Sequence, residues 1–238
     1  MDILKDKNRG KVNEELEKQY SPSCWSHRMD RSEVIESHIK EMTKGTIKGR
    51  NEAHTNLDEA YGQEDYEKLD IYLPPNSSTA PTLLIYFHGG YWQMLSKDMS
   101  GFMVPPLIEA GVTVVVVDYV LAPKGNMDTI VSQVRRSVAY IVQQYSAVRS
   151  DAMRNSPLEL VNNMKGLDRN SEIVVAVAQY DSTEFRKQSQ EYYQAIKVAG
   201  FNASFQDVTN RDHFDVIEKL VEENYILTQV LLKMVTRK

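Results

Sequence analysis

The chain has 238 residues, of which 42% are hydrophobic, and a formal net charge of −5. That length favours a single α/β domain, and the composition excludes a disordered chain. The negative charge and the scattered basic residues argue against nucleic acid or an anionic membrane as partner. Cys24 is the only cysteine, so no intrachain disulfide can form, which is typical of a reducing compartment.

The start of the sequence, residues 1–10, is charged and lacks the apolar core of a secretory signal peptide. A membrane-spanning helix needs about 18 consecutive apolar residues, and no such run occurs. We therefore expect a cytoplasmic protein, with a nuclear pool as an alternative location.

Hydrophobic periodicity predicts the elements in chain order. Predicted helices cover residues 9–20, 30–47, 99–110, 127–145, 158–164, 182–199 and 214–236. Predicted strands cover residues 68–74, 82–88, 112–118, 173–179 and 203–208. Strands and helices alternate from residue 82 onward, which predicts a mostly parallel sheet with helices on both faces. In this interpretation residues 1–66 are a helical lead-in, and residues 67–238 form the sheet-and-helix core of one domain.

The first buried strand runs directly into His88-Gly89-Gly90-Tyr91-Trp92. Two glycines let the backbone turn with positive φ and direct N–H groups outward. Such donors stabilise the negative oxygen of an acyl-transfer transition state, often by about 3 kcal/mol each. The segment is therefore a candidate oxyanion loop, and the alternative is a glycine turn that only ends a strand. We expect His88 to be a structural hydrogen-bonding group rather than a catalyst.

Asp181 and His213 are the candidate acid and general base. Ligands in parallel α/β sheets bind outside the carboxyl ends of the strands, and Asp181 follows the third buried strand. His213 lies after the last strand, where an α/β-hydrolase carries its base. The alternatives are that Asp181 caps the next helix and that His213 is an ordinary helix-start residue. We expect Asp212 and Asp215 to be solvated acids at a helix start.

The nucleophile is the missing part of this pattern. The elbow of an α/β-hydrolase reads Gly-x-Ser-x-Gly, and no such segment occurs in the sequence. Ser146, Ser150 and Ser156 have no apolar strand before them and no flanking glycines, so we interpret them as loop or cap residues. Ser100 is interpreted in the same way, as a residue at a helix start.

The chain resembles the kynurenine formamidase (arylformamidase) family of α/β-hydrolases. The matching segments are Tyr20-Ser21-Pro22-Ser23 with Trp25, His88-Gly89-Gly90-Tyr91-Trp92, Val117-Asp118-Tyr119, Leu121-Ala122-Pro123, Asn155-Ser156-Pro157-Leu158, residues 181–186 and residues 211–215. The resemblance implies hydrolysis of N-formyl-L-kynurenine to L-kynurenine and formate in tryptophan catabolism. It also implies a Ser-Asp-His triad without cofactor or metal, in which Asp181 and His213 match the acid and the base.

The family would have the nucleophile strand and its elbow between Tyr145 and Ser146. Two βα units of about 30 residues each suggest that roughly 60 residues are absent at this junction. We therefore expect a chain that is either poorly folded or resealed, with the strand at 173–179 beside the strand at 82–88. The alternatives for function are an inactive splice-type isoform and a short-chain carboxylesterase. The expected partner is a small formamide substrate, and a homodimer is compatible with the sequence.

Overall fold

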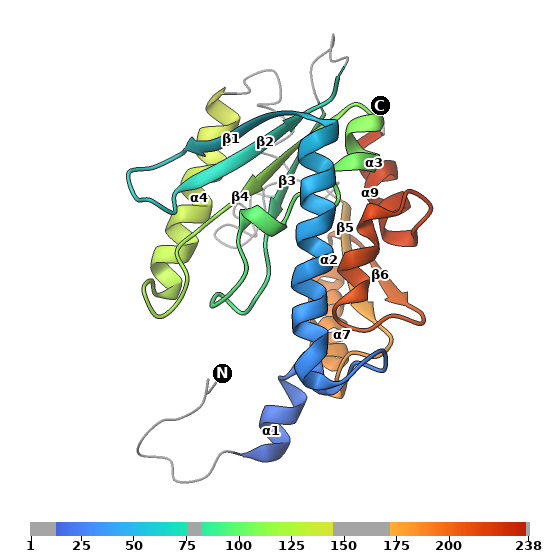
Figure 1. Ribbon diagram of the computed structural model, residues 1–238. Helices are drawn as coiled ribbons and strands as arrows, with labels where there is room; N and C mark the ends of the chain where they lie inside the picture. The colour runs from blue at the N-terminus through green and yellow to red at the C-terminus, as the bar shows by residue number, and fades with distance from the viewer. Residues whose placement is uncertain (1–12, 76–81, 145–171, 237–238) are drawn as a thin grey trace. The chain divides into compact units, whose positions relative to one another are not determined.

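The computed structural model describes residues 13–75, 82–144 and 172–236 (Figure 1). These residues belong to two compact units. The organisation of the whole chain as a single domain stays a prediction.

The larger unit comprises residues 39–171 and 218–238 and contains a mixed sheet. Its strands are, in spatial order, β1 (His54–Ala60), β2 (Lys68–Leu73), β4 (Val112–Val117) and β3 (Thr82–Phe87). β2 runs antiparallel to both of its neighbours, whereas β3 and β4 are parallel. The described strands from residue 82 onward pair in parallel, as expected, and the antiparallel β1 and β2 that precede them make the sheet of this unit mixed.

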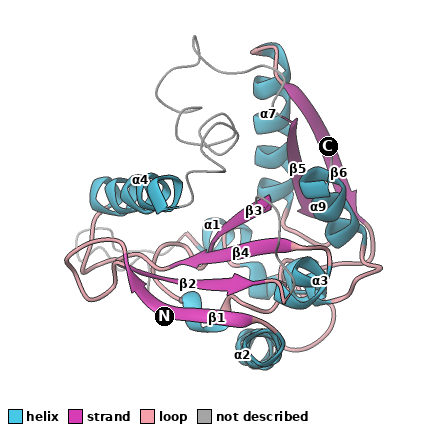
Figure 2. Ribbon diagram, turned by 90° about the horizontal axis from the view of Figure 1, so that it is seen from above, coloured by secondary structure: helices cyan, strands magenta, loops and turns pink. Residues whose placement is uncertain are grey.

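Helices cover both faces of this sheet, as expected. The helices of this unit are most of α2 (Arg31–Glu52), η2 (Lys97–Met99), α3 (Val104–Glu109), α4 (Met127–Gln144), η4 (Lys219–Val221) and α9 (Ile226–Thr236). Figure 2 shows α4 on one face of the sheet and α3 on the other. α3 is shorter than the predicted helix because two prolines occupy its first turn, where the missing N–H groups are not needed.

The alternation of side chains along β4 builds a core on each face of the sheet. Successive residues of a strand point to opposite faces, and all six residues of β4 are buried. Val115 and Val117 pack in one cluster with Ile141 of α4. On the other face, the ring of Phe102 meets Tyr86 of β3 edge to face, with 5.9 Å between the ring centroids.

The smaller unit comprises residues 1–38 and 172–217 and is built around a βαβ segment. Its elements are α1 (Glu14–Gln19), η1 (Pro22–Cys24), the start of α2, β5 (Glu172–Ala178), α7 (Thr183–Val198), β6 (Asn202–Val208) and most of α8 (Asp215–Glu218). β5 and β6 are parallel and in register over their whole length. Gly200 follows α7 with a φ of +87°, a conformation that glycine adopts without strain.

Two further differences concern β1 and the last predicted helix. β1 lies inside the expected helical lead-in. The sequence predicts no strand there, because its largely exposed, polar residues lack the alternation that marks a strand. β1 is held instead by its hydrogen-bonded ladder to β2. The predicted helix at 214–236 is three helices, since Glu222 has an extended ψ of 120° and ends η4. The hydroxyl of Thr228 then donates to the Leu220 carbonyl across the break, at 3.2 Å.

The resealed sheet is also not what the described strands form. β3 makes its parallel ladder with β4, and β5 makes its own with β6, in two separate sheets. η2 and α3 connect β3 to β4, and α7 connects β5 to β6. Such short closures cost less chain entropy than distant pairings. The predicted helix at 158–164 lies outside the described residues. In the described part of the chain, no helix has the length and apolar character needed to cross a membrane.

Candidate active site

His213 and Asp181 are hydrogen-bonded to each other. The Nδ1 of His213 lies 2.8 Å from Oδ1 of Asp181, although 32 positions separate them in the sequence. Asp181 follows β5 and is buried, whereas the His213 side chain is 37% exposed. Within the described residues the other ring nitrogen of His213, Nε2, has no hydrogen-bond partner. A neutral imidazole that donates from Nδ1 carries its lone pair on Nε2, and this is the tautomer that a general base needs.

The local backbone fixes the Asp181 carboxylate. Its Oδ2 accepts the N–H of Ala178 at 3.0 Å, so the two oxygens serve two different donors. The alternative role, capping of α7, falls to Ser182, whose hydroxyl accepts the N–H of Phe185 at 3.2 Å. The alternative interpretation of Asp181 as the cap of α7 is therefore wrong. The Asp181 carboxylate is available to His213.

Aromatic rings hold the His213 imidazole from the side. Phe185 meets it edge to face, with the ring centroids 5.1 Å apart, and Phe214 meets it at 5.8 Å. Phe185 lies in the first turn of α7, directly after the segment that carries Asp181. The short segment of residues 181–185 therefore supplies both the acceptor of the imidazole and part of its apolar wall.

The acids on either side of His213 are not solvated, contrary to expectation. Asp212 and Asp215 are 0% and 3% exposed. Burial alone would raise the pKa of Asp212, but hydrogen bonds from Arg28 and Ser26 bring it well below the ordinary value. The pKa of Asp215 is raised, chiefly by burial. The sequence pattern missed this because the partners of Asp212 come from the other end of the chain.

The candidate oxyanion loop follows β3 in the larger unit. Gly90 has a φ of +101°, and a Cβ at this position would lie 2.3 Å from the carbonyl oxygen of Met94. Tyr91 and Trp92 also have positive φ, so the turn is left-handed over three residues. The N–H groups of Gly89 and Gly90 donate to no described acceptor, and a Cβ on Gly89 would meet open space. The loop therefore presents two backbone donors.

His88 lies buried at the base of this loop and is held on both ring nitrogens. Nδ1 is 2.9 Å from the Gly89 carbonyl oxygen, and Nε2 is 3.2 Å from Oδ1 of Asp118. The ring of Tyr119 stacks on the imidazole at 4.2 Å, and its hydroxyl donates to the His88 carbonyl. Burial, with the charge of Asp118, raises the pKa of Tyr119 to about 12. These contacts agree with a structural hydrogen-bonding role for His88.

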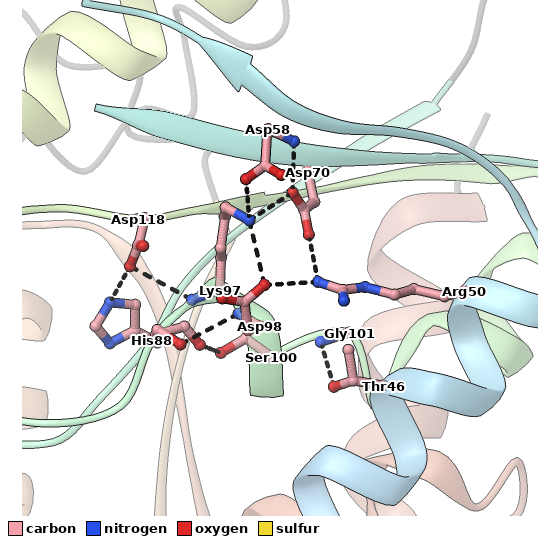
Figure 3. A network of polar contacts seen from close by, with 11 residues as sticks. Thr46, Arg50, Asp58, Asp70, His88, Lys97, Asp98, Ser100, Gly101 and Asp118 are labelled. Atoms are coloured by element: carbon pink, nitrogen blue, oxygen red, sulfur yellow. Dashed lines mark hydrogen bonds and ion pairs between the residues drawn. The ribbon is translucent and has the colours of Figure 1, made fainter. Parts of the chain in front are cut away.

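An ionic network centred on the buried side chains of Lys97 and Asp70 is connected to Asp118 (Figure 3). The backbone N–H of Lys97 donates to Asp118, and the Lys97 ammonium lies 2.8 Å from Asp58 and 2.9 Å from Asp70. Arg50 of α2 binds the second oxygen of Asp70 at 2.9 Å. Burial lowers the pKa of Lys97, but the hydrogen bonds to the two aspartates outweigh it, so the net shift is upward.

Asp118 connects the network to the base of the loop, because it contacts both His88 and the N–H of Lys97. Among the described residues, no group of three or more His, Cys, Asp or Glu side chains is arranged to hold a metal ion. The network is not predictable from the sequence, because its members come from an exposed strand, a buried strand, a helix and a loop.

Of the four serines considered in the sequence, only Ser100 lies within the described residues, and it is not exposed as a nucleophile would be. Ser100 is fully buried, and its hydroxyl donates to the Ser96 carbonyl at 2.6 Å. Ser146, Ser150 and Ser156 lie outside the described residues.

Curated relatives match nearly the whole chain. A kynurenine formamidase of Danio rerio is 42% identical over 281 aligned residues, covering 93% of this chain and 96% of the relative. This chain belongs to the kynurenine formamidase family. The kynurenine formamidase of Salmo salar is also 42% identical, with 98% and 99% of the two chains covered. The sequence model of the BD-FAE family matches residues 69–156.

The alignments with the Danio rerio and Salmo salar relatives are longer than this chain. The alignment with the salmon kynurenine formamidase spans 294 residues, whereas this chain has 238. Part of the relative therefore has no counterpart here, although both ends are covered. Two βα units would account for roughly 60 residues. The alignment length supports an internal deletion, and its position at the junction of Tyr145 and Ser146 stays a prediction.

Solved structures show the fold of this family member. An arylesterase structure matches with a TM-score of 0.62 at 17% identity, covering 87% of this chain and 93% of that chain. An esterase of Pyrobaculum calidifontis matches with a TM-score of 0.61 at 15% identity and the same coverage. The prediction of an α/β-hydrolase fold is therefore confirmed.

Proposed function

We propose that this chain is a kynurenine formamidase-type hydrolase, which converts N-formyl-L-kynurenine and water into L-kynurenine and formate. The observation that carries the proposal is the 2.8 Å contact between His213 Nδ1 and Asp181, which leaves Nε2 without a described partner. Identity of 42% with two curated kynurenine formamidases supports the choice of substrate. The reaction belongs to tryptophan catabolism by the kynurenine pathway.

In this proposal His213 is the general base and Asp181 its orienting acid. Nε2 takes a proton from the attacking nucleophile and later returns it to the leaving amine. Asp181 accepts from Nδ1, which fixes the tautomer and stabilises the imidazolium that forms. The apolar edge contact from Phe185 limits rotation of the ring.

The segment from His88 to Trp92 is proposed as the oxyanion motif, of the form HGGXW. The N–H groups of Gly89 and Gly90 would stabilise the oxygen that becomes negative when the formyl carbon is attacked. Tyr91 and Trp92 are 36% and 47% exposed. Their rings can therefore pack against the aromatic ring of the substrate.

The sequence favours a non-catalytic form of the family member as a second candidate. No Gly-x-Ser-x-Gly segment occurs, and part of the relatives' sequence has no counterpart in this chain. In the family scheme, serine attacks the formyl carbon, the amine leaves, and water releases formate from the formyl-serine. Without that serine the chain would retain the acid–base pair and the loop but not the covalent step.

Formate release from N-formyl-L-kynurenine by the purified chain separates these candidates. Hydrolysis that disappears in His213→Ala supports the proposed enzyme. His54→Ala is the matched control for loss of a histidine, because His54 is exposed at the start of β1. Absence of hydrolysis in the parent chain would favour the non-catalytic form. Hydrolysis of a short-chain aryl ester but not of the formamide would indicate the carboxylesterase alternative instead.

Labelling by a fluorophosphonate tests the nucleophile directly. The probe forms a stable bond only with an activated serine, so the non-catalytic candidate predicts no labelling of this chain, whereas an enzyme that follows the family scheme would be labelled. Labelled protein, followed by identification of the modified residue, would contradict the missing nucleophile.

We further propose a cytoplasmic location and no nucleic-acid or membrane partner, which the single cysteine and the negative net charge support. A homodimer is a further proposal, and light scattering coupled to gel filtration tests it.

A further inference from the structure

Asp212, the residue before His213, carries a fully occupied carboxylate. Its Oδ2 accepts from the Ser26 hydroxyl at 2.6 Å and from Nε of Arg28 at 2.9 Å. Its Oδ1 accepts from Nη2 of Arg28 at 3.3 Å and from two backbone N–H groups, those of Phe214 and Asp215. A carboxylate offers about four lone-pair sites, so these five contacts use all of its acceptor capacity.

The two backbone contacts fix the peptide on the far side of His213. The nitrogens of Phe214 and Asp215 lie 3.0 and 2.9 Å from Oδ1 of Asp212. The Asp212 side chain therefore closes a hydrogen-bonded turn that contains the His213 backbone. The N–H of Asp212 itself donates to the Asp215 carboxylate at 2.7 Å. The backbone that carries the imidazole is therefore held by hydrogen bonds before and after His213.

The charge on Arg28 holds the Asp212 carboxylate beneath the turn that carries His213. A buried carboxylate without its cation would move toward water, and the turn that it holds through Phe214 and Asp215 would move with it. The bidentate contact from Arg28 compensates the charge of Asp212 and occupies both oxygens. Asp181, by contrast, has one oxygen directed to His213 and one to the Ala178 N–H.

We propose that Ser26, Arg28 and Asp212 form a positioning clamp for His213, so that residues near the start of the chain fix the tautomer and direction of its imidazole. The catalytic meaning of the clamp rests on the proposed function, in which His213 is the base. The three are positioning residues, since they act through His213. All of them lie in one compact unit with the Asp181–His213 pair.

The clamp can be tested by nitrogen NMR of the full chain labelled at its histidine rings. The two ring nitrogens give different shifts, so the spectrum reports the tautomer of His213 at a pH where the ring is neutral. We expect the parent to be mainly the Nδ1–H tautomer, because Asp181 accepts from Nδ1. Arg28→Met loosens the turn that carries His213 and weakens this contact, so the population should shift toward Nε2–H. Arg28→Lys keeps the charge but not the bidentate fork, so it should recover only part of the Nδ1–H population.

Arg31→Met is the matched control, because Arg31 pairs with Glu17 at 3.4 Å on the surface of the same unit. It should leave the His213 spectrum unchanged, while thermal melting reports whether each variant folds. If Arg28→Met does not fold, Arg28→Lys and the milder Ser26→Ala decide the matter. A folded variant of this set whose His213 tautomer equals that of the parent would overturn the clamp.

Formate release, measured on the same variants, keeps the two proposals distinguishable. A tautomer shift in a chain that releases no formate would sustain the clamp and contradict the proposed enzyme. Formate release with an unchanged tautomer in Arg28→Met would overturn the clamp and leave the enzyme standing.

Discussion

The ammonium of Lys97 lies 2.9 Å from Oδ1 of Asp70, and their side chains are 5% and 0% exposed. A charged pair this deep is stable only when every remaining polar atom finds a partner. Here Arg50 takes the second oxygen of Asp70, and Asp58 takes another N–H of Lys97. The pair joins the sheet to the segment that follows the candidate oxyanion loop, since the Lys97 N–H also contacts Asp118.

Lys97→Met should destabilise the larger unit strongly. The change leaves the Asp70 carboxylate buried with one cation fewer, and breaking a buried pair from one side costs about 3–5 kcal/mol. Urea unfolding followed by circular dichroism measures the loss. Lys44→Met is the control, because Lys44 is 79% exposed and its contact with Glu41 is 4.0 Å long, so its effect should be negligible. Equal stabilities for the two variants would show that the network contributes nothing to folding.

Gly90→Ala should lower the thermal stability of the chain, whereas Gly89→Ala should leave it nearly unchanged, although the two residues are neighbours. A Cβ at Gly90 would lie 2.3 Å from the Met94 carbonyl oxygen, and its φ of +101° is unfavourable for alanine. Strain of this kind costs on the order of 1–3 kcal/mol, whereas Gly89 has open space and normal φ. Thermal melting of both variants is the measurement, and a destabilised Gly89→Ala with an unaffected Gly90→Ala would contradict the loop geometry.

Asp181→Asn should reverse the tautomer of His213. The amide can turn its NH₂ group toward Nδ1, which then becomes an acceptor and places the proton on Nε2. If the chain hydrolyses N-formyl-L-kynurenine, the rate should fall by about 10⁴-fold, as expected when a base is held in the wrong tautomer. Asp207→Asn is the control on the same unit, because Asp207 pairs with Arg186 and not with a histidine.

The Asp212 carboxylate should stabilise the folded chain near neutral pH and lose this effect in acid. Its pKa in the folded chain is lower than in the unfolded chain, where a carboxyl takes up its proton near about pH 4. Its contribution is therefore present above that pH and is lost as the pH falls toward the folded pKa. Asp212→Asn removes this contribution, so its urea midpoint should fall less steeply than that of the parent between about pH 5 and pH 2.

Asp215 serves as a control, because its pKa shift has the opposite sign to that of Asp212. Its pKa is raised, chiefly by burial, so its contribution is present at low pH and is lost as the pH rises. Asp215→Asn should therefore make the loss of stability toward acid steeper, not flatter. Identical slopes for the parent and both variants would exclude a role of this pair in acid stability.

The strands that form the core were predictable because their side chains are apolar regardless of context. The runs at 82–88, 112–118 and 173–179 correspond to β3, β4 and β5 to within one residue at each end. β1 was not predictable, because a polar edge strand is defined by the ladder that it makes with its neighbour. The expected solvation of Asp212 failed for a similar reason, since Arg28 approaches it across 184 positions of sequence.

The sequence by itself determined the candidate residues of the site. His88–Trp92, Asp181 and His213 were identified from strand ends, chain order and family resemblance, and the absence of a Gly-x-Ser-x-Gly elbow is a property of the sequence alone. Only the tertiary structure decided which oxygen serves which proton: Asp181 faces His213, Ser182 caps α7, and Asp212 is taken by Ser26 and Arg28. The reason is that a carboxylate looks the same in any sequence, whereas its partners are set by hydrogen-bond geometry over a few ångströms, between residues that the chain brings together only on folding.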